Sequence, residues 1–276
     1  EEKERESYPS DLTDEQWEEI APLYTGMRKC TWSKRELTDA VLYLVDSGCK
    51  WRQLPHDFPP YSTVHSFYRR ARISGLWDRI LEHLVKKTRT NAGRKESPSY
   101  AIIDSQSVKT VAASEEEELM EEKNERQEAA IVVDVLGCLL SVVVHAANIH
   151  DTKSGISTAK RAYERYPSIQ KFCADAGYRG TFVSDLKEQL ELDADISEKI
   201  KPHQWEILPW RWVVERTLSW LNHSRRLSKD YEISVYLLGY GHNFAFQYSA
   251  QTLVNTGSYC HPYSAYERGS NENGNR

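Results

Sequence analysis

The sequence predicts a mixed α/β domain preceded by a small helical domain, and three observations support this prediction. Apolar residues recur at helical spacing through the first hundred residues. A polar segment, NAGRKESPS (91–99), separates that region from short runs rich in β-branched residues. Strand-like and helix-like segments then alternate, which is typical of a sheet covered by helices on both faces.

Four helices are expected in the first hundred residues. Two of them begin at capping-box spacings, in which Thr13 is followed by Gln16 and Ser33 by Glu36. A proline-rich breaker precedes a third helix near 62–73, and a fourth helix is expected after Gly75. The apolar positions of the first, second and fourth helices are Trp17, Ile20, Ala21, Leu37, Ala40, Val41, Leu44, Val45, Trp77, Ile80, Leu81, Leu84 and Val85.

The second half of the chain begins with three expected strands. The run YAIIDSQSV (100–108) is apolar and ends in polar residues, and two β-branched runs joined at Leu136-Gly137 predict a hairpin. A further short strand, ending on an Asp and a Gly, is expected in QKFCADAGY (170–178). Helices are expected at about 152–165, near 181–190 and from about Pro209. The predicted organisation is a helical domain (8–90), a linker (91–99), an α/β domain (100–258) and a disordered tail (259–276).

Composition excludes several classes of protein. Hydrophobic residues make up 39% of the 276 residues, which is enough to fill a core. No apolar run approaches the roughly 20 residues needed to span a bilayer, and the opening EEKERES does not resemble a signal peptide. The five cysteines are scattered without a CxxC pair, so we expect neither a zinc site nor a disulfide framework. A cytoplasmic location fits this pattern.

The net charge of −5 hides an uneven distribution. Residues 115–128, EEEELMEEKNERQE, carry eight Glu against one Lys and one Arg, a net charge of −6. Residues 8–100 hold 15 Lys and Arg against 12 Asp and Glu. The chain therefore has a mildly basic first part and one acidic segment, so its overall charge does not exclude a nucleic-acid partner.

Three acidic residues lie where a metal site is plausible. Asp104 and Asp175 each follow a short apolar run at the point where a buried strand turns polar, and Glu215 lies in the helix expected from Pro209. Two-metal phosphoryl chemistry needs several carboxylates that converge on ions about 3.5–4 Å apart, and magnesium prefers oxygen ligands. The structural alternatives remain open: an Asp after a strand is often a turn residue or a helix cap, and Glu215 with Arg211 has the i, i+4 spacing of a simple ion pair.

Longer phrases carry a resemblance to a known family. YPSDLTDEQWEEIAPL (8–23) and GCKWRQLPHDFPPYSTVHSFYRR (48–70) resemble the N-terminal domain of bacterial insertion-sequence transposases of the insertion sequence five family. The catalytic core of that family is similar, in order, to AIIDSQSVKT (101–110), VDVLGCLLSVVVHAANIHD (133–151), ADAGYRG (174–180) and PWRWVVERTLSWLNHSRRLSKDYE (209–232).

The resemblance covers roughly residues 8–255 and implies a ribonuclease-H-like catalytic fold. It implies that Asp104, Asp175 and Glu215 are the catalytic residues and hold two Mg²⁺ or Mn²⁺ ions, and that Arg211 belongs to the signature around the glutamate. The implied activity is metal-dependent DNA strand cleavage and strand transfer, in which ions clamp the attacking and leaving oxygens. Because two element ends must be held together, a homodimer on double-stranded DNA is expected, in the cytoplasm with the nucleoid.

One segment departs from the family pattern. Where the family has a stretch rich in Gly, Lys and Arg before the second strand, this chain has the acidic residues SEEEELMEEKNERQEAA (114–130). An alternative function is therefore that of a catalytically impaired, transposase-derived DNA-binding protein. A repair or resolvase nuclease on the same fold is a third reading, which the family-like N-terminal region disfavours.

The helix near 62–73 is the expected DNA-reading element. Its apolar positions Val64, Phe67, Tyr68 and Ala71 predict an inward face, which leaves Arg69, Arg70 and Arg72 mostly outward. With the preceding helix and turn this gives a helix-turn-helix arrangement, whose second helix enters the major groove. The alternative is an ordinary solvated helix face. Further candidate DNA contacts are Lys109, Arg211, Arg225 and Arg226.

Overall fold

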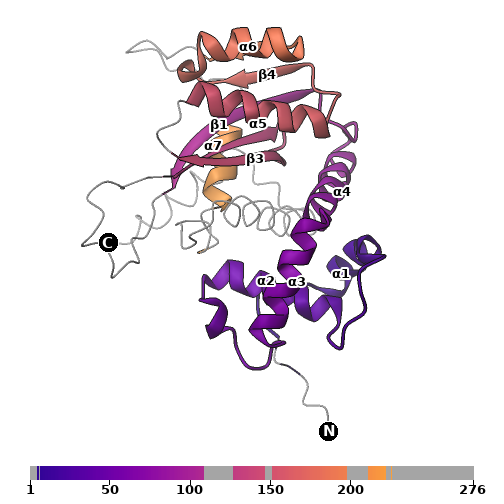
Figure 1. The fold of residues 1–276 in the computed structure, drawn as a ribbon. Helices are drawn as coiled ribbons and strands as arrows, with labels where there is room; N and C mark the ends of the chain where they lie inside the picture. Colours follow the sequence, from indigo (N-terminus) through magenta and orange to yellow (C-terminus); the bar gives the residue numbers. More distant parts are fainter. Residues whose placement is uncertain are drawn as a thin grey trace, which may run out of the picture.

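The computed structural model of this chain describes residues 5, 7–108, 127–146, 151–197, 211–221 and 225. These residues form a helical N-terminal region and a five-stranded mixed sheet with helices on both faces (Figure 1). The predicted tail at 259–276 and the acidic segment, apart from the backbone of its last two residues, lie outside the described residues. Within the described part of the chain, no helix combines the length and apolar character needed to cross a membrane.

The four predicted helices of the N-terminal region are confirmed. They are α1 (Asp14–Ile20), α2 (Lys34–Ser47), α3 (Tyr61–Ile73) and α4 (Leu76–Asn91), with short 3-10 turns η1 (Ala21–Tyr24) and η2 (Trp51–Gln53). Both capping boxes are present: Gln16 N donates to Thr13 Oγ1 over 3.2 Å, and Glu36 N donates to Ser33 Oγ over 3.1 Å. Local sequence therefore fixes where α1 and α2 begin, because each cap satisfies amide groups that the helix itself leaves unbonded.

The connection between α2 and α3 is longer than the turn of a typical helix-turn-helix motif. Residues 48–60 join α2 to α3 and include η2, whereas the turn of a helix-turn-helix motif has about three or four residues. The short connection lies instead between α3 and α4, where Ser74 is followed by Gly75 at φ 67°, a left-handed backbone that favours glycine. The breaker prolines do separate the two helices, as predicted, but they belong to a long connection rather than a tight turn.

The sheet has the strand order β3-β2-β1-β4-β5. Its strands are β1 (Tyr100–Val108), β2 (Gln127–Asp134), β3 (Leu139–Ala146), β4 (Lys171–Ala174) and β5 (Asp193–Ile196). The β1–β2 and β2–β3 pairs are antiparallel, and the β1–β4 and β4–β5 pairs are parallel. This arrangement is the ribonuclease-H-like sheet that the resemblance implied. Strand β5 was not predicted, because its four residues, DADI, are too few and too polar to stand out as a strand.

The predicted hairpin at Leu136-Gly137 is confirmed, and the turn has a clear local cause. Gly137 has φ 87°, which a residue with a Cβ rarely adopts. Asp134 Oδ1 accepts hydrogen bonds from Leu136 N (2.9 Å) and Cys138 N (2.8 Å). The aspartate thus satisfies the amide groups that the turn removes from the β2–β3 ladder.

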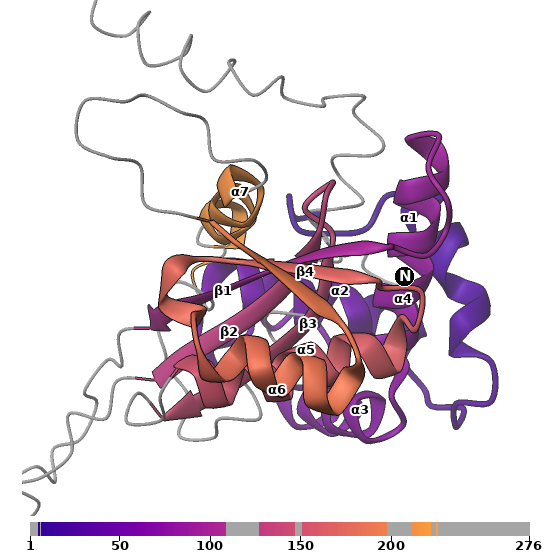
Figure 2. The ribbon, with the colours of Figure 1, turned by 90° about the horizontal axis from the view of Figure 1, so that it is seen from above.

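Helices cover both faces of the sheet, as predicted. Figure 2 shows α5 (Asp151–Arg165) and α6 (Thr181–Leu190) on one side and α7 (Arg211–Leu221) on the other. Helix α5 packs on β1, β2 and β3, whereas α7 packs on β1 and β2. The expected start of α7 near Pro209 falls just before the described residues.

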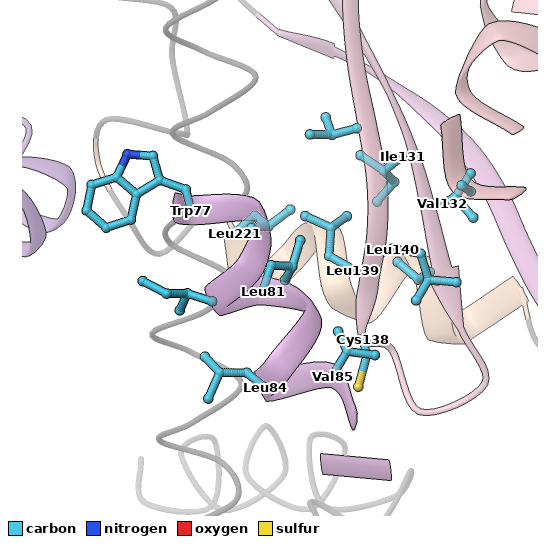
Figure 3. Packing of buried hydrophobic residues seen from close by; sticks show 14 of the residues in the cluster. Trp77, Leu81, Leu84, Val85, Ile131, Val132, Cys138, Leu139, Leu140 and Leu221 are labelled. Atoms are coloured by element: carbon cyan, nitrogen blue, oxygen red, sulfur yellow. The ribbon is translucent and has the colours of Figure 1, made fainter. Parts of the chain in front are cut away.

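Helix α4 joins the helical region to the sheet. Its buried residues Leu81 and Val85 lie beside Leu139 and Cys138 at the start of β3 (Figure 3). Two ion pairs reinforce this packing: Arg89 with Asp134, both buried, and Asp78 with Arg165 of α5 over 2.5 Å. One continuous apolar core therefore crosses the predicted linker, and the division into domains 8–90 and 100–258 remains a prediction.

Candidate active site

The two candidate aspartates lie next to each other, just beyond the point where the parallel pairing of β1 with β4 ends. In the parallel β1–β4 pair, Ile102 is opposite Cys173, so the chain two residues further on brings Asp104 and Asp175 to neighbouring positions. Both line a small hollow, together with Ile102, Ile103, Cys173, Ala174, Ser197 and Val214. Ligands of open α/β sheets bind outside the carboxyl ends of parallel strands, which is where this hollow lies.

Asp104 sits inside a regular strand. On its other side it is paired with Ile131 of β2, so its backbone is held by the sheet. Its side chain is half-buried, and Oδ1 accepts a hydrogen bond from Ser105 N over 2.9 Å. The neighbouring strands therefore fix the direction from which this carboxylate enters the hollow.

The sequence left open whether Asp175 belongs to a metal site or is a turn or cap residue, and its position is compatible with both. Its Oδ1 accepts a hydrogen bond from Gly177 N over 2.8 Å and so caps the 3-10 turn η4 (Ala176–Tyr178). A Cβ at position 177 would lie only 3.0 Å from that same oxygen, so glycine gives the carboxylate the room it uses. Asp175 is a cap, and it also lines the hollow.

Glu215 lies on α7, beside this hollow but not among its lining residues. On this helix Val213, Val214, Thr217 and Leu221 are buried, and Glu215 is exposed. Val214, the residue directly before Glu215 in the chain, lines the hollow, so the glutamate lies next to the site. Among the residues with described side chains, no three of the types His, Cys, Asp and Glu are close enough to hold a metal ion. The structure therefore brings the two aspartates together, and the ligand set remains a prediction.

The chemistry of the hollow suits a hard divalent cation. Asp104 and Asp175 supply carboxylate oxygens, and Ser197 supplies a hydroxyl. Mg²⁺ and Mn²⁺ prefer such oxygen donors over thiolate or imidazole. The two carboxylates are the residues that would hold an ion here, and α7, which contributes Val214 to the lining, carries Glu215 as the candidate third ligand.

Ser197 is a lining residue that the sequence did not reveal. It follows β5, and its backbone N–H donates to Ala174 O over 2.9 Å. Its Oγ lies 3.7 Å from Cys173 Sγ. Because β5 was not predicted, nothing in the sequence placed this serine at the sheet edge; the one available signal was a polar residue following a short run.

The candidate DNA-binding arginines of α3 lie away from this hollow. Val64, Phe67, Tyr68 and Ala71 are buried, as predicted. Arg69 and Arg70 are exposed and Arg72 is half-buried. Figure 1 shows α3 at the far end of α4 from the sheet, so the structure does not bring these arginines to the aspartates.

The remaining candidate cations are described only in part. Arg225 is exposed. Lys109 and Arg226 lie outside the described residues, and of Arg211 only the backbone is described. Their predicted contacts with DNA therefore remain predictions.

Comparison with known proteins identifies the class to which this fold and site belong. Residues 95–234 match the family model of the transposase DDE domain, and residues 12–81 match the putative transposase of the IS4/5 family. The first match covers half of the chain. The chain belongs to the DDE transposases, and its N-terminal region matches those of the IS4/5 group.

Individual relatives are consistent with this family. The chain is 30% identical over 115 residues to the insertion element IS402 uncharacterized 16.2 kDa protein of Burkholderia cepacia, covering 38% of this chain and 76% of that protein. It is 32% identical over 80 residues to uncharacterized protein y4sN of Sinorhizobium fredii (strain NBRC 101917 / NGR234), covering 28% of this chain and 64% of that protein.

Among solved structures, the Mos1 strand transfer complex has 10% identity and a TM-score of 0.26, with 86% of this chain and 81% of that chain covered. The Mos1 mariner paired end complex with Mn has 11% identity and a TM-score of 0.27, with 91% and 90% covered. These scores are too low to support an argument, so the fold rests on the strand order and the family.

Proposed function

We propose that this chain is an active transposase, which cuts and joins DNA at the ends of an insertion sequence with two Mg²⁺ or Mn²⁺ ions held by Asp104, Asp175 and Glu215. One observation carries the proposal: the two aspartates lie two residues beyond the last parallel pair of β1 and β4, and both line one hollow. Family membership supplies the class of reaction.

The protein's part in this reaction is to hold charged groups in place. The Ser105 and Gly177 amides bind one oxygen of Asp104 and of Asp175, which orients each carboxylate. Glu215 would approach from α7, whose preceding residue Val214 lines the hollow. When bound, two such ions activate the attacking hydroxyl and stabilise the leaving oxygen of the phosphodiester.

DNA would meet the protein at two places. Arg69, Arg70 and Arg72 of α3 would bind the element ends, and Lys109, Arg211, Arg225 and Arg226 would bind backbone phosphates near the catalytic site. Arginine forms bidentate bonds with phosphate and with guanine, which suits both tasks. Two copies of the chain would hold the two ends, in the cytoplasm with the nucleoid.

A second candidate function has an observation in its favour. The acidic segment 115–128 leads directly into β2, where Glu128 is opposite Ser107 and Ile131 is opposite Asp104. The segment thus ends on the strand that borders the catalytic candidate, where its charge opposes a DNA backbone. This favours a transposase-derived protein that binds DNA without cutting it.

The two functions are separated by one experiment. The protein is incubated with Mg²⁺ and DNA carrying candidate element ends, and nicking at the 3′ ends is measured. Asp104→Asn, Asp175→Asn and Glu215→Gln should each lower cleavage by about a hundredfold or more, because metal-dependent transfer fails when a ligand is neutralised. DNA binding in a gel shift should persist in all three.

The matched control is Glu188→Gln, which neutralises an exposed carboxylate on α6. It should cleave like the wild type. Cleavage within tenfold of the wild type in any one of the three variants would remove that residue from the site. Binding without nicking in the wild type would establish the second candidate.

A further inference from the structure

The turn between β2 and β3 is bonded directly to α7. Arg216 Nη2 donates to Leu136 O over 2.8 Å, and Thr217 Oγ1 lies 3.0 Å from Gly137 O. Thr217 is fully buried, and its hydroxyl also lies 3.1 Å from Val213 O within the helix. The two residues that directly follow Glu215 in the sequence are therefore bonded to a turn 80 residues away.

The contact between the turn and the helix is as close as the backbone permits. A Cβ at position 137 would lie 2.9 Å from Thr217 Oγ1 and 3.0 Å from Arg216 Nη2. The backbone of Gly137 is also left-handed, at φ 87°. Glycine thus serves two purposes here, because it allows the turn and admits the helix.

Arg216 is held between two aromatic rings. Its guanidinium carbon lies 4.7 Å from the ring centroid of Trp212 and 4.6 Å from that of Trp220. Residues four apart lie on one stripe of a helix, so the two indoles bracket the arginine from successive turns. Cation–π contacts on both sides restrict the guanidinium to the orientation that reaches Leu136 O.

The turn has a fixed position of its own. Asp134 binds its amide groups, and the same carboxylate pairs with Arg89 of α4. Arg89 Nε also donates to Lys95 O over 2.8 Å. A buried ion pair whose remaining donors are bonded holds its geometry closely, so the turn is a rigid support for α7.

We propose that Arg216 and Thr217 are positioning residues: by binding the β2–β3 turn they set the register of α7 on the sheet, and with it the place of Glu215 relative to Asp104 and Asp175. This inference rests on the proposed metal-binding role of Glu215. A helix advances about 1.5 Å and turns about 100° per residue, so a slip of one residue would turn the glutamate away from its present direction.

The test measures Mn²⁺ binding to the full chain by electron paramagnetic resonance of the free ion, in parallel with thermal unfolding. Thr217→Val keeps the shape of the side chain and removes the hydroxyl. It should weaken Mn²⁺ binding by about tenfold, as removal of a partner outside the ligand shell does in other metal sites. Thr217→Ser restores the hydroxyl and should bind Mn²⁺ within about twofold of the wild type.

The matched control is Thr158→Val on α5. Thr158 is also fully buried, and its hydroxyl donates to Ser154 O over 2.8 Å, within its own helix and on the opposite face of the sheet. Thr158→Val removes a buried hydrogen bond, as Thr217→Val does, and should lower the free energy of unfolding by a similar amount. Mn²⁺ binding should nevertheless be unchanged, which separates positioning from general destabilisation.

Arg216→Gln separates a positioning role from a purely electrostatic one, because the two roles predict changes in Mn²⁺ affinity of opposite sign. If Arg216 acts only through its charge, removing a cation near the site strengthens Mn²⁺ binding. If it positions α7, the variant weakens Mn²⁺ binding although a repelling charge is gone. This variant also decides the question if Thr217→Val does not fold.

The remaining outcomes distinguish the inference from the proposed function. If Asp104→Asn and Glu215→Gln both leave Mn²⁺ binding unchanged, the proposed metal site is wrong. If Glu215→Gln weakens binding but Thr217→Val and Arg216→Gln match Thr158→Val, only the positioning role is overturned. If Asp104→Asn weakens binding and Glu215→Gln does not, Glu215 is no ligand and the inference fails with it.

Discussion

At the scale of single residues, Asp39 on α2 shows how burial controls a charge in this fold. Its side chain is 4% exposed, and burial raises its pKa to about 6. The hydrogen bond from Leu12 N (3.0 Å) and the nearby Arg5 and Arg35 oppose that rise, and Asp11 adds to it. Because the folded pKa lies above the unfolded value, this group favours folding most below about pH 4, and that contribution is lost as the pH rises through about 6.

We therefore predict that Asp39→Asn stabilises the protein at pH 8 by on the order of 1–2 kcal/mol, since the amide oxygen still accepts from Leu12 N and no charge is buried. The gain should disappear near pH 4. Urea unfolding at the two pH values measures this, with the exposed Asp46→Asn on the same helix as control. A variant less stable than the wild type at pH 8 would show that the ion pair with Arg5 outweighs the cost of burial.

The buried pair Arg89–Asp134 leads to the opposite prediction. Asp134→Asn keeps an acceptor for the turn amides but leaves the arginine, with 6% of its side chain exposed, without a charged partner in this pair. Breaking such a pair costs about 3–5 kcal/mol, which urea unfolding at pH 7 would detect. Glu82→Gln breaks the half-exposed pair with Lys86 and should cost less than about 1 kcal/mol. Equal losses in the two variants would contradict this account of the buried pair.

At the scale of elements, α3 carries the predicted DNA-reading face. Changing Arg69, Arg70 and Arg72 to Ala should weaken binding to element ends and lower the salt slope by about 0.9 for each phosphate that is no longer neutralised. Gel shifts across a salt series measure both quantities. The control Arg28→Ala, Lys29→Ala and Lys50→Ala removes the same charge from exposed positions of the helical region. Should the two triple variants behave alike, α3 is not the recognition helix.

The acidic segment has an effect of its own at this scale. Replacing Glu115, Glu116, Glu117, Glu118, Glu121 and Glu122 with Gln should raise DNA affinity, most clearly at low salt. The reason is that charges within about 8–10 Å of a phosphate still repel it at physiological salt, and the segment ends on the strand that borders Asp104. Fluorescence anisotropy at several salt concentrations is the measurement, and affinity that stays constant throughout would leave the segment without this role.

At the scale of the whole molecule, the core continues through α4 into the sheet. Removing residues 1–90 would take away Leu81 and Val85, and with them the apolar cover of Cys138 and Leu139. We therefore predict that a chain starting at residue 91 is unfolded or aggregated, because a buried apolar surface would face water. A chain starting at residue 75 keeps α4 and should retain more structure. Circular dichroism and size-exclusion chromatography compare them, and a folded, monomeric shorter chain would show that the two regions are separate domains.

The sequence by itself determined the features that depend on neighbouring residues. Capping residues placed the starts of α1 and α2, and apolar periodicity placed the buried face of α2. In α1 the buried residues are Ile20, which was predicted, and Gln16, which was not. The pair Leu136-Gly137 placed the hairpin, because the left-handed backbone of the turn is a local property. Strand β1, which contains Asp104, and strand β4, which directly precedes Asp175, were also found, since a buried strand that turns polar is visible within a few residues.

Only the tertiary structure decided which of these features meet. Parallel pairing of β1 with β4 put the two aspartates side by side, although about 70 residues separate them. Strand β5 is too short to be found from its sequence, and its place is set by pairing with β4. The support of α7 by Leu136 and Gly137 spans 80 residues. Such contacts depend on how whole elements pack, and that packing energy is not encoded at any one position in the chain.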